Sequence, residues 1–104
     1  MEKLTEDNFA TTVSNGIVLV KFGASWCSPC KMMDRILIKI SDQYKSESNI
    51  KICHMDIDES PAIAQAFAIS SVPTMIFVKD GVKSAPFVGI KAEKDIVSML
   101  ESLK

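Results

Sequence analysis

The residues from Ile17 to Phe22 constrain the fold of this chain more than any other segment. Ile17-Val18-Leu19-Val20-Lys21-Phe22 is a nearly continuous apolar run, rich in β-branched residues and without polar alternation. Such a run is typical of a strand that is buried on both faces, inside a parallel or mixed sheet. We therefore expect a layered fold, with helices on both sides of this strand.

The segments around this strand alternate between helical and strand patterns. The pattern predicts a helix from Glu6, strands at Ile50–Ile57 and Thr74–Val78, an antiparallel return strand at Val82–Val88, and helices after Cys30, Ser60 and Lys91. Thr5 and Ser60 are expected helix caps, and a short strand is expected at Lys3-Leu4. This order predicts an α/β fold: a mixed sheet of four to five strands with flanking helices. At 104 residues we expect one domain, 1–104.

Charge and hydropathy exclude several classes of function. The formal net charge is −1 and the lysines are scattered, so no nucleic-acid surface is expected. No apolar run approaches the ~20 residues that span a bilayer, so no membrane partner is expected either. The first seven residues include the acids Glu2, Glu6 and Asp7, whereas a signal peptide begins with a basic segment that is followed by an apolar one. We expect a cytoplasmic protein, where thiols stay reduced.

The sequence Trp26-Cys27-Ser28-Pro29-Cys30 is the segment that points to chemistry. Two cysteines at i and i+3 at a helix start lie on one face, about 5 Å apart, within reach of a disulfide. Free N–H groups at the helix start lower the pKa of the first thiol, and proline is tolerated there. A thiolate there can attack a disulfide, and the second thiol can resolve the mixed disulfide. Trp26 would supply an apolar platform beside the sulfur.

Metal binding by these cysteines is the weaker alternative. A zinc site would need Cys53 and His54 as further ligands, but adjacent residues on a strand point to opposite faces. Haem attachment would need His where Lys31 stands. We therefore expect no metal, and we expect Cys53 to be a small buried side chain.

The segment Trp26-Cys27-Ser28-Pro29-Cys30-Lys31-Met32 resembles the W-C-G-P-C-K-M motif of the thioredoxin family. Further similarities are Val72-Pro73-Thr74, Ile57-Asp58-Glu59-Ser60-Pro61 and Gly89, so the resemblance extends over essentially the whole chain. It implies a thioredoxin fold with Cys27 as nucleophile and Cys30 as resolving thiol. It also implies a cis-proline at Pro73, and a substrate groove formed by Trp26, Val72, Pro73, Gly89 and Ile90.

The chain departs from the family pattern at Lys21, where thioredoxins usually have a buried acid. Lys21 could reach an edge of the sheet or pair with Asp56 or Asp58. Alternatively, a cation lies behind the active-site helix and favours thiolates, by at most about 2.8 kcal/mol at roughly 6 Å and an effective dielectric near 20. The second reading predicts a more acidic, more oxidising pair. His54 could be structural or could accept a proton, and the Ser28 hydroxyl could adjust the redox potential.

These observations predict a thiol–disulfide oxidoreductase that reduces protein disulfides through its redox-active pair Cys27–Cys30, with no other cofactor. The resemblance implies recharging by an NADPH- and FAD-dependent thioredoxin reductase, and we expect a monomer. One alternative is a thiol oxidant or isomerase with a more oxidising pair. The other is a non-catalytic binding subunit with this fold.

Overall fold

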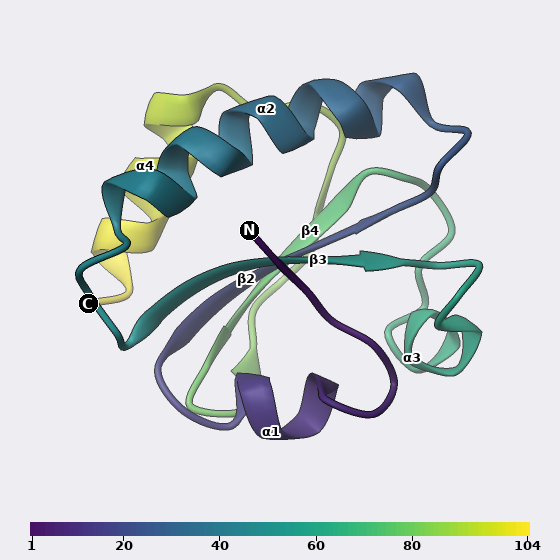
Figure 1. Ribbon diagram of the computed structural model, residues 1–104, viewed down its shortest axis with the longest axis horizontal. Coiled ribbons are helices and arrows are strands. Elements are labelled where there is room, and N and C mark those ends of the chain that lie inside the picture. The colour runs from purple at the N-terminus through teal and green to yellow at the C-terminus, as the bar shows by residue number, and fades with distance from the viewer.

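The computed structural model describes residues 1–104, and the run around Val20 forms the long strand at its centre (Figure 1). Strands and helices alternate along most of the chain, as the sequence predicted. The elements are β1 (Glu2–Lys3), α1 (Phe9–Val13), β2 (Ile17–Gly23), α2 (Ser28–Gln43), β3 (Ile50–Asp56), α3 (Pro61–Ala66), β4 (Thr74–Lys79), β5 (Val82–Lys83), β6 (Phe87–Val88) and α4 (Glu93–Ser102).

All six strands belong to one mixed sheet with β2 inside it. The order is β1-β3-β2-β4-β5, and β6 also pairs with β4. β2 is parallel to β3 and antiparallel to β4. Because β2 has a neighbour on each side and helices on each face, all seven of its residues are buried. This is the mixed sheet with flanking helices that the element order predicted, and it agrees with the fold that the resemblance implied.

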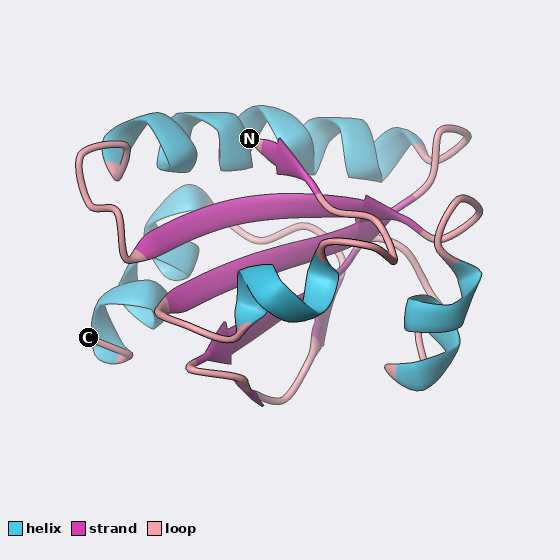
Figure 2. Ribbon diagram, turned by 60° about the horizontal axis from the view of Figure 1, so that its bottom comes forward, coloured by secondary structure: helices cyan, strands magenta, loops and turns pink.

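The two faces of the sheet are covered by different helices. Figure 1 shows α2 and α4 on one side of the strands and α1 on the other, and in the turned view of Figure 2 α1 lies in front of the strands. Ile17 and Leu19 of β2 pack in the cluster that includes residues of α2 and α4, whereas Val18, Val20 and Phe22 pack in the cluster with residues of α1. Strand periodicity therefore places Lys21, like Leu19, on the α2 face.

Three local expectations were wrong in detail. The first helix begins at Phe9 rather than Glu6: the Thr5 hydroxyl accepts a hydrogen bond from Asp7 N–H, and Asn8 occupies the cap position. Ser60 is the N-cap of α3 and Pro61 its first residue, as expected, but the Ser60 side chain makes no cap hydrogen bond. The short N-terminal strand lies at Glu2–Lys3, one residue earlier than expected.

The return strand expected at Val82–Val88 is divided into β5 and β6, so the sheet has six strands rather than four or five. Ser84 lies between them and takes over part of the ladder: its N–H donates to Phe77 O at 2.8 Å, and its Oγ accepts from Phe77 N–H at 3.2 Å. Pro86 has no N–H to continue the ladder.

None of the helices combines the length and the apolar character that a bilayer crossing needs.

Candidate active site

The cysteine pair lies where the chain leaves β2 and enters α2. Cys27 is the N-cap of α2, and its Sγ accepts a hydrogen bond from the Cys30 N–H at 3.2 Å. Pro29 is in the first turn, where no intrahelical N–H partner exists. The two cysteines form a disulfide with a Cα–Cα distance of 5.3 Å, as the spacing predicted. Ser28, between them, is exposed.

The disulfide is largely covered by apolar side chains. Cys27 and Cys30 pack with Ala24, and Ile57 and Val72 contact this group from its edge. Cys27 is 5% exposed and Cys30 is 1% exposed. Both residues are thus buried, and Cys27 is the less enclosed of the two.

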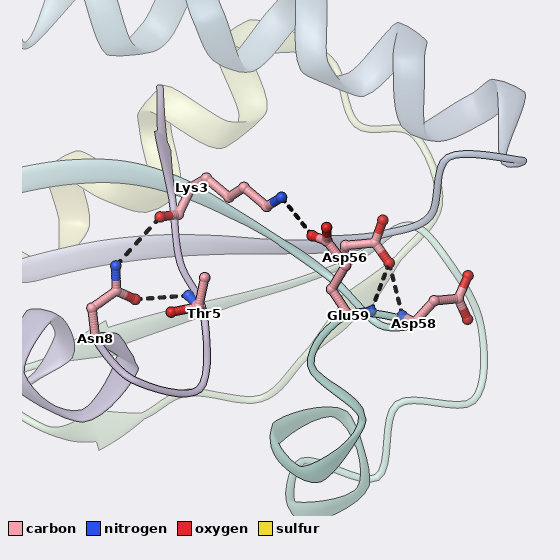
Figure 3. A network of polar contacts seen from close by, with 6 residues as sticks. All are labelled: Lys3, Thr5, Asn8, Asp56, Asp58 and Glu59. Carbon is pink, nitrogen blue, oxygen red and sulfur yellow. Dashed lines mark hydrogen bonds and ion pairs between the residues drawn. The ribbon is translucent and has the colours of Figure 1, made fainter.

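Trp26 directly precedes Cys27, and its side chain is held by the turn after β3. It is 67% exposed, and its Nε1–H donates to Asp58 Oδ2 at 3.0 Å. Asp56 holds this turn in place: its Oδ1 accepts from the N–H groups of Asp58 at 2.7 Å and Glu59 at 3.2 Å (Figure 3). An ion pair between Lys3 and Glu59 adds a second link, at 2.5 Å, to the N-terminal strand.

The opposite rim consists of the Val72-Pro73 segment and the loop after β6. The Val72–Pro73 peptide bond is cis, as the resemblance implied. Gly89 N–H donates to Pro73 O at 2.9 Å with φ at +91°, a conformation that favours glycine. Ile90 follows and is 48% exposed. Of the residues named for the groove, Val72 contacts the disulfide group directly, and the hydrogen bond to Pro73 joins Gly89 to the same segment. The substrate groove itself stays a prediction.

Lys21 is buried, at 4% exposure, and forms an ion pair with Asp34, with Nζ and Oδ1 2.5 Å apart. The expectation that Lys21 pairs with Asp56 or Asp58, or reaches the edge of the sheet, was wrong. Lys21 points toward α2, and Asp34 lies on α2 one turn after Cys30, so both face the same space. Sequence reasoning missed Asp34, although its position four residues after Cys30 indicated a shared helix face.

Gly23 provides the space in which Lys21 reaches the disulfide. A Cβ built on Gly23 would lie 3.0 Å from Lys21 Nζ and 3.2 Å from Cys30 Sγ, so these two atoms are no more than about 6 Å apart. A cavity of about 180 Å³ opens at this point. Its charged and polar lining includes Lys21, Ser25, Cys30, Lys31, Asp34, His54 and Asp56.

His54 lines this cavity from β3, in register with Lys21. Burial lowers the pKa of His54 from 6.5, and the Lys21 charge lowers it further, so the imidazole is neutral at pH 7. The neighbouring Cys53 packs on the other face of the sheet, where burial raises its pKa to about 12. No group of three or more His, Cys, Asp or Glu side chains is placed to hold a metal ion.

Comparison with known proteins agrees with this geometry. The family model "Thioredoxin" matches residues 1–102. The chain is 38% identical to a thioredoxin of Chlamydia muridarum over 93% of this chain and 92% of that protein. It is 35% identical to a thioredoxin of Staphylococcus saprophyticus over 95% and 93% of the two chains.

A solved structure has the same fold. It is described as the structural basis of the thiol resolving mechanism in yeast mitochondrial 1-Cys peroxiredoxin via glutathione/thioredoxin systems. One of its chains matches with a TM-score of 0.84 and 28% identity, over 98% of this chain and 94% of that one.

The fold and the cysteine pair define a thiol–disulfide oxidoreductase that acts on protein disulfides and receives electrons from a reductase partner. The chain belongs to the thioredoxin family.

Proposed function

We propose that this single domain, 1–104, reduces protein disulfides in the cytoplasm, with Cys27 as the attacking sulfur and Cys30 as the resolving sulfur. The observation that supports these roles is the position of Cys27 at the N-cap of α2, more exposed than Cys30. There the backbone N–H groups and the helix dipole stabilise a thiolate at Cys27.

In the proposed reaction the Cys27 thiolate attacks one sulfur of the substrate disulfide. The substrate S–S bond breaks, its electron pair leaves on the second substrate sulfur, and Cys27 forms a mixed disulfide. Cys30 then loses its proton and attacks Cys27 Sγ, which releases the first substrate sulfur as a thiolate. The substrate is reduced by two electrons and the Cys27–Cys30 disulfide is formed.

The substrate segment is proposed to lie between Trp26 and the cis-proline rim. The exposed apolar surfaces of Trp26 and Ile90 flank this path, and the backbone of Val72 offers hydrogen bonds to an extended chain. Pro73 and Gly89 shape the rim through their backbone hydrogen bond. Ser28 is exposed beside both sulfurs and is proposed to donate its hydroxyl hydrogen to a thiolate there.

His54 is proposed as the acceptor of the Cys30 proton. Its neutral imidazole lines the same cavity as Cys30, which has room for a bridging water. Lys21 is proposed to act on the same sulfur through its charge, since it lies within about 6 Å of Cys30 Sγ. Because Asp34 neutralises much of that charge, reduction rather than oxidation of substrates is the proposed direction.

The proposed electron donor is a flavoprotein reductase that uses NADPH, and the chain is proposed to work as a monomer without a further cofactor. NADPH oxidation coupled to insulin reduction would test the donor, and sedimentation would test the oligomeric state. If the Cys27–Cys30 disulfide stayed oxidised with every NADPH-dependent flavoprotein reductase tested, the proposed electron donor would be wrong.

Insulin reduction by dithiothreitol-charged protein is the decisive assay. Cys27→Ser should lose all turnover. Cys30→Ser should instead accumulate a mixed disulfide through Cys27, which mass spectrometry would detect. Cys53→Ser is the matched control and should keep its activity. If Cys30→Ser lost activity without a trapped adduct, or Cys27→Ser formed one, the assigned roles would be wrong.

A further inference from the structure

The ion pair Lys21–Asp34 takes no part in the bond-breaking and bond-forming steps described above, although its charges lie beside Cys30. Lys21 is 4% exposed, and the Asp34 side chain is 33% exposed. Neither side chain lies on the substrate path between Trp26 and Pro73. A buried ammonium group needs a counter-charge, and here that counter-charge comes from the active-site helix itself, one turn after Cys30.

We propose that Asp34 sets the reduction potential of the Cys27–Cys30 pair by neutralising Lys21 beside Cys30. This inference rests on the proposed dithiol reaction and adds to it a residue that acts through another. Asp34 is thus a positioning residue, because it changes the field that Lys21 exerts on the sulfur.

The distances determine the size of the effect. Lys21 Nζ is no more than about 6 Å from Cys30 Sγ. An uncompensated unit charge at roughly 6 Å, in an effective dielectric near 20, favours a thiolate over a thiol about a hundredfold at most. The Asp34 carboxylate lies 2.5 Å from the same nitrogen, so the sulfur experiences a dipole instead of a full charge.

Other charged and titratable groups near Cys30 do not replace this pair. Asp56 also carries a negative charge on the cavity, but its Oδ1 is held by two backbone N–H groups in the turn after β3, and the residue is the same in every variant compared below. His54 is neutral at pH 7 because burial lowers its pKa. Lys31 follows Cys30 on α2 but is exposed, where solvent screens its charge. Lys21 with Asp34 is therefore the partly buried charge pair that acts on Cys30.

The redox consequence follows from the products of reduction. A donor thiolate attacks the protein disulfide, the Cys27–Cys30 bond breaks, and a mixed disulfide forms. A second donor thiolate then attacks the donor sulfur of this mixed disulfide and releases the protein sulfur. The donor leaves oxidised, and the protein keeps two electrons as a thiolate and a thiol. Cys27 and Cys30 are bonded neighbours at the helix start, so a cation beside Cys30 stabilises a thiolate on either sulfur, favours the reduced protein and makes the pair more oxidising. Asp34, by masking Lys21, keeps the pair reducing.

The test is the equilibrium of each variant with reduced and oxidised glutathione at pH 7. Asp34→Asn should shift the equilibrium constant at least about tenfold toward the reduced protein, which is about 30 mV for a two-electron couple. Lys21→Met combined with Asp34→Asn should return within about threefold of the wild type, because both charges are then absent. Asp42→Asn is the matched control, since Asp42 lies near the other end of α2, about three turns after Cys30, and pairs with the exposed Lys45 at 3.4 Å.

Asp34→Asn leaves the buried Lys21 without a counter-charge, which can prevent folding. Lys21→Met leaves only Asp34 unpaired, and Asp34 is partly exposed, so this variant provides an independent readout. Lys21→Met should shift the equilibrium in the opposite direction, toward the disulfide. The proposal is overturned if Asp34→Asn stays within threefold of the wild type, if the double variant shifts as far as Asp34→Asn, or if Lys21→Met favours the reduced protein. Insulin reduction by the wild type separately tests the underlying function.

Discussion

The indole Nε1–H of Trp26 donates to Asp58 Oδ2 at 3.0 Å, which ties the tryptophan beside the nucleophile to the turn after β3. Trp26 is nevertheless 67% exposed, so the hydrogen bond, rather than packing, determines its orientation. It is also the only tryptophan of the chain, and its fluorescence therefore reports on this rim alone.

Asp58→Ala should weaken substrate binding, because the indole loses its acceptor and its fixed orientation. A hydrogen bond to a charged acceptor contributes about 1.5–3 kcal/mol, less at an exposed site, so we expect KM for insulin to rise roughly three- to tenfold with little change in kcat. Asp58→Asn keeps an acceptor oxygen and is the control. Equal kinetics and equal tryptophan emission in Asp58→Ala and the wild type would show that the contact is unimportant.

Gly23→Ala should destabilise the protein and disturb the active site together. The new Cβ would meet Lys21 Cε and Nζ at 3.0 Å and Cys30 Sγ at 3.2 Å. Because the lysine head can shift, we expect a loss of about 1–2 kcal/mol in the free energy of unfolding, measured with urea. Gly16→Ala is the comparison: there the Cβ would meet the backbone oxygen of Asn49 at 2.4 Å, so the loss should be larger. The reverse ranking would contradict this account.

Cys53 should limit stability at high pH. Burial raises its pKa to about 12, whereas the unfolded thiol titrates near 9.0. The folded state thus keeps the proton that the unfolded state loses, so the stabilisation is complete below pH 9 and falls by at most about 1.4 kcal/mol per pH unit as the pH rises toward 12. Cys53→Ala should show a shallower alkaline loss in urea unfolding between pH 8 and 10.5. If the free energy of unfolding fell equally with pH in Cys53→Ala and the wild type, the raised pKa of Cys53 would not be the cause.

His54→Ala should slow the step in which Cys30 resolves the mixed disulfide, by at least about tenfold at pH 7. Since burial lowers the pKa of His54 from 6.5, the acid limb of the wild-type rate should lie below pH 6.5 and should be absent in the variant. Stopped-flow tryptophan fluorescence from pH 5 to 8 would measure both. His54→Gln keeps a polar side chain but accepts no proton at these pH values. An unchanged pH profile in both variants would exclude the role.

The strands and the active-site helix could be predicted because their information is local. The continuous apolar run of β2 indicated burial on both faces, and Cys27 and Cys30 placed two thiols on one helix turn. The alternation of faces also predicted that Cys53 and His54 separate, as their packing shows. The resemblance at Val72-Pro73 added the cis peptide bond, which local preference alone would not favour.

The predictions that were wrong concern features that depend on contacts between side chains and other parts of the chain. The partner of Lys21 could not be chosen from the sequence, because Asp34, Asp56 and Asp58 all follow β2 at plausible positions and only the packing of α2 on the sheet selects one. Similarly, the division of the last hairpin depends on the hydroxyl of Ser84 bonding to Phe77 across the strands. The late start of α1 reflects Asn8, whose side chain accepts from Thr5 N–H at 2.7 Å and so favours a turn.

The cap of α2 is a sulfur atom, and that atom is also the one that reacts. Cys27 Sγ accepts the Cys30 N–H, and hydrogen bonds to an ionised acceptor are about twice as strong as those to a neutral one. The start of the helix should therefore be held most firmly when the protein is reduced and ready to attack, and less firmly once the disulfide has formed. Amide hydrogen exchange in the first turn of α2 should therefore be slower in the reduced protein than in the oxidised protein, and its rate reports the redox state of the active site.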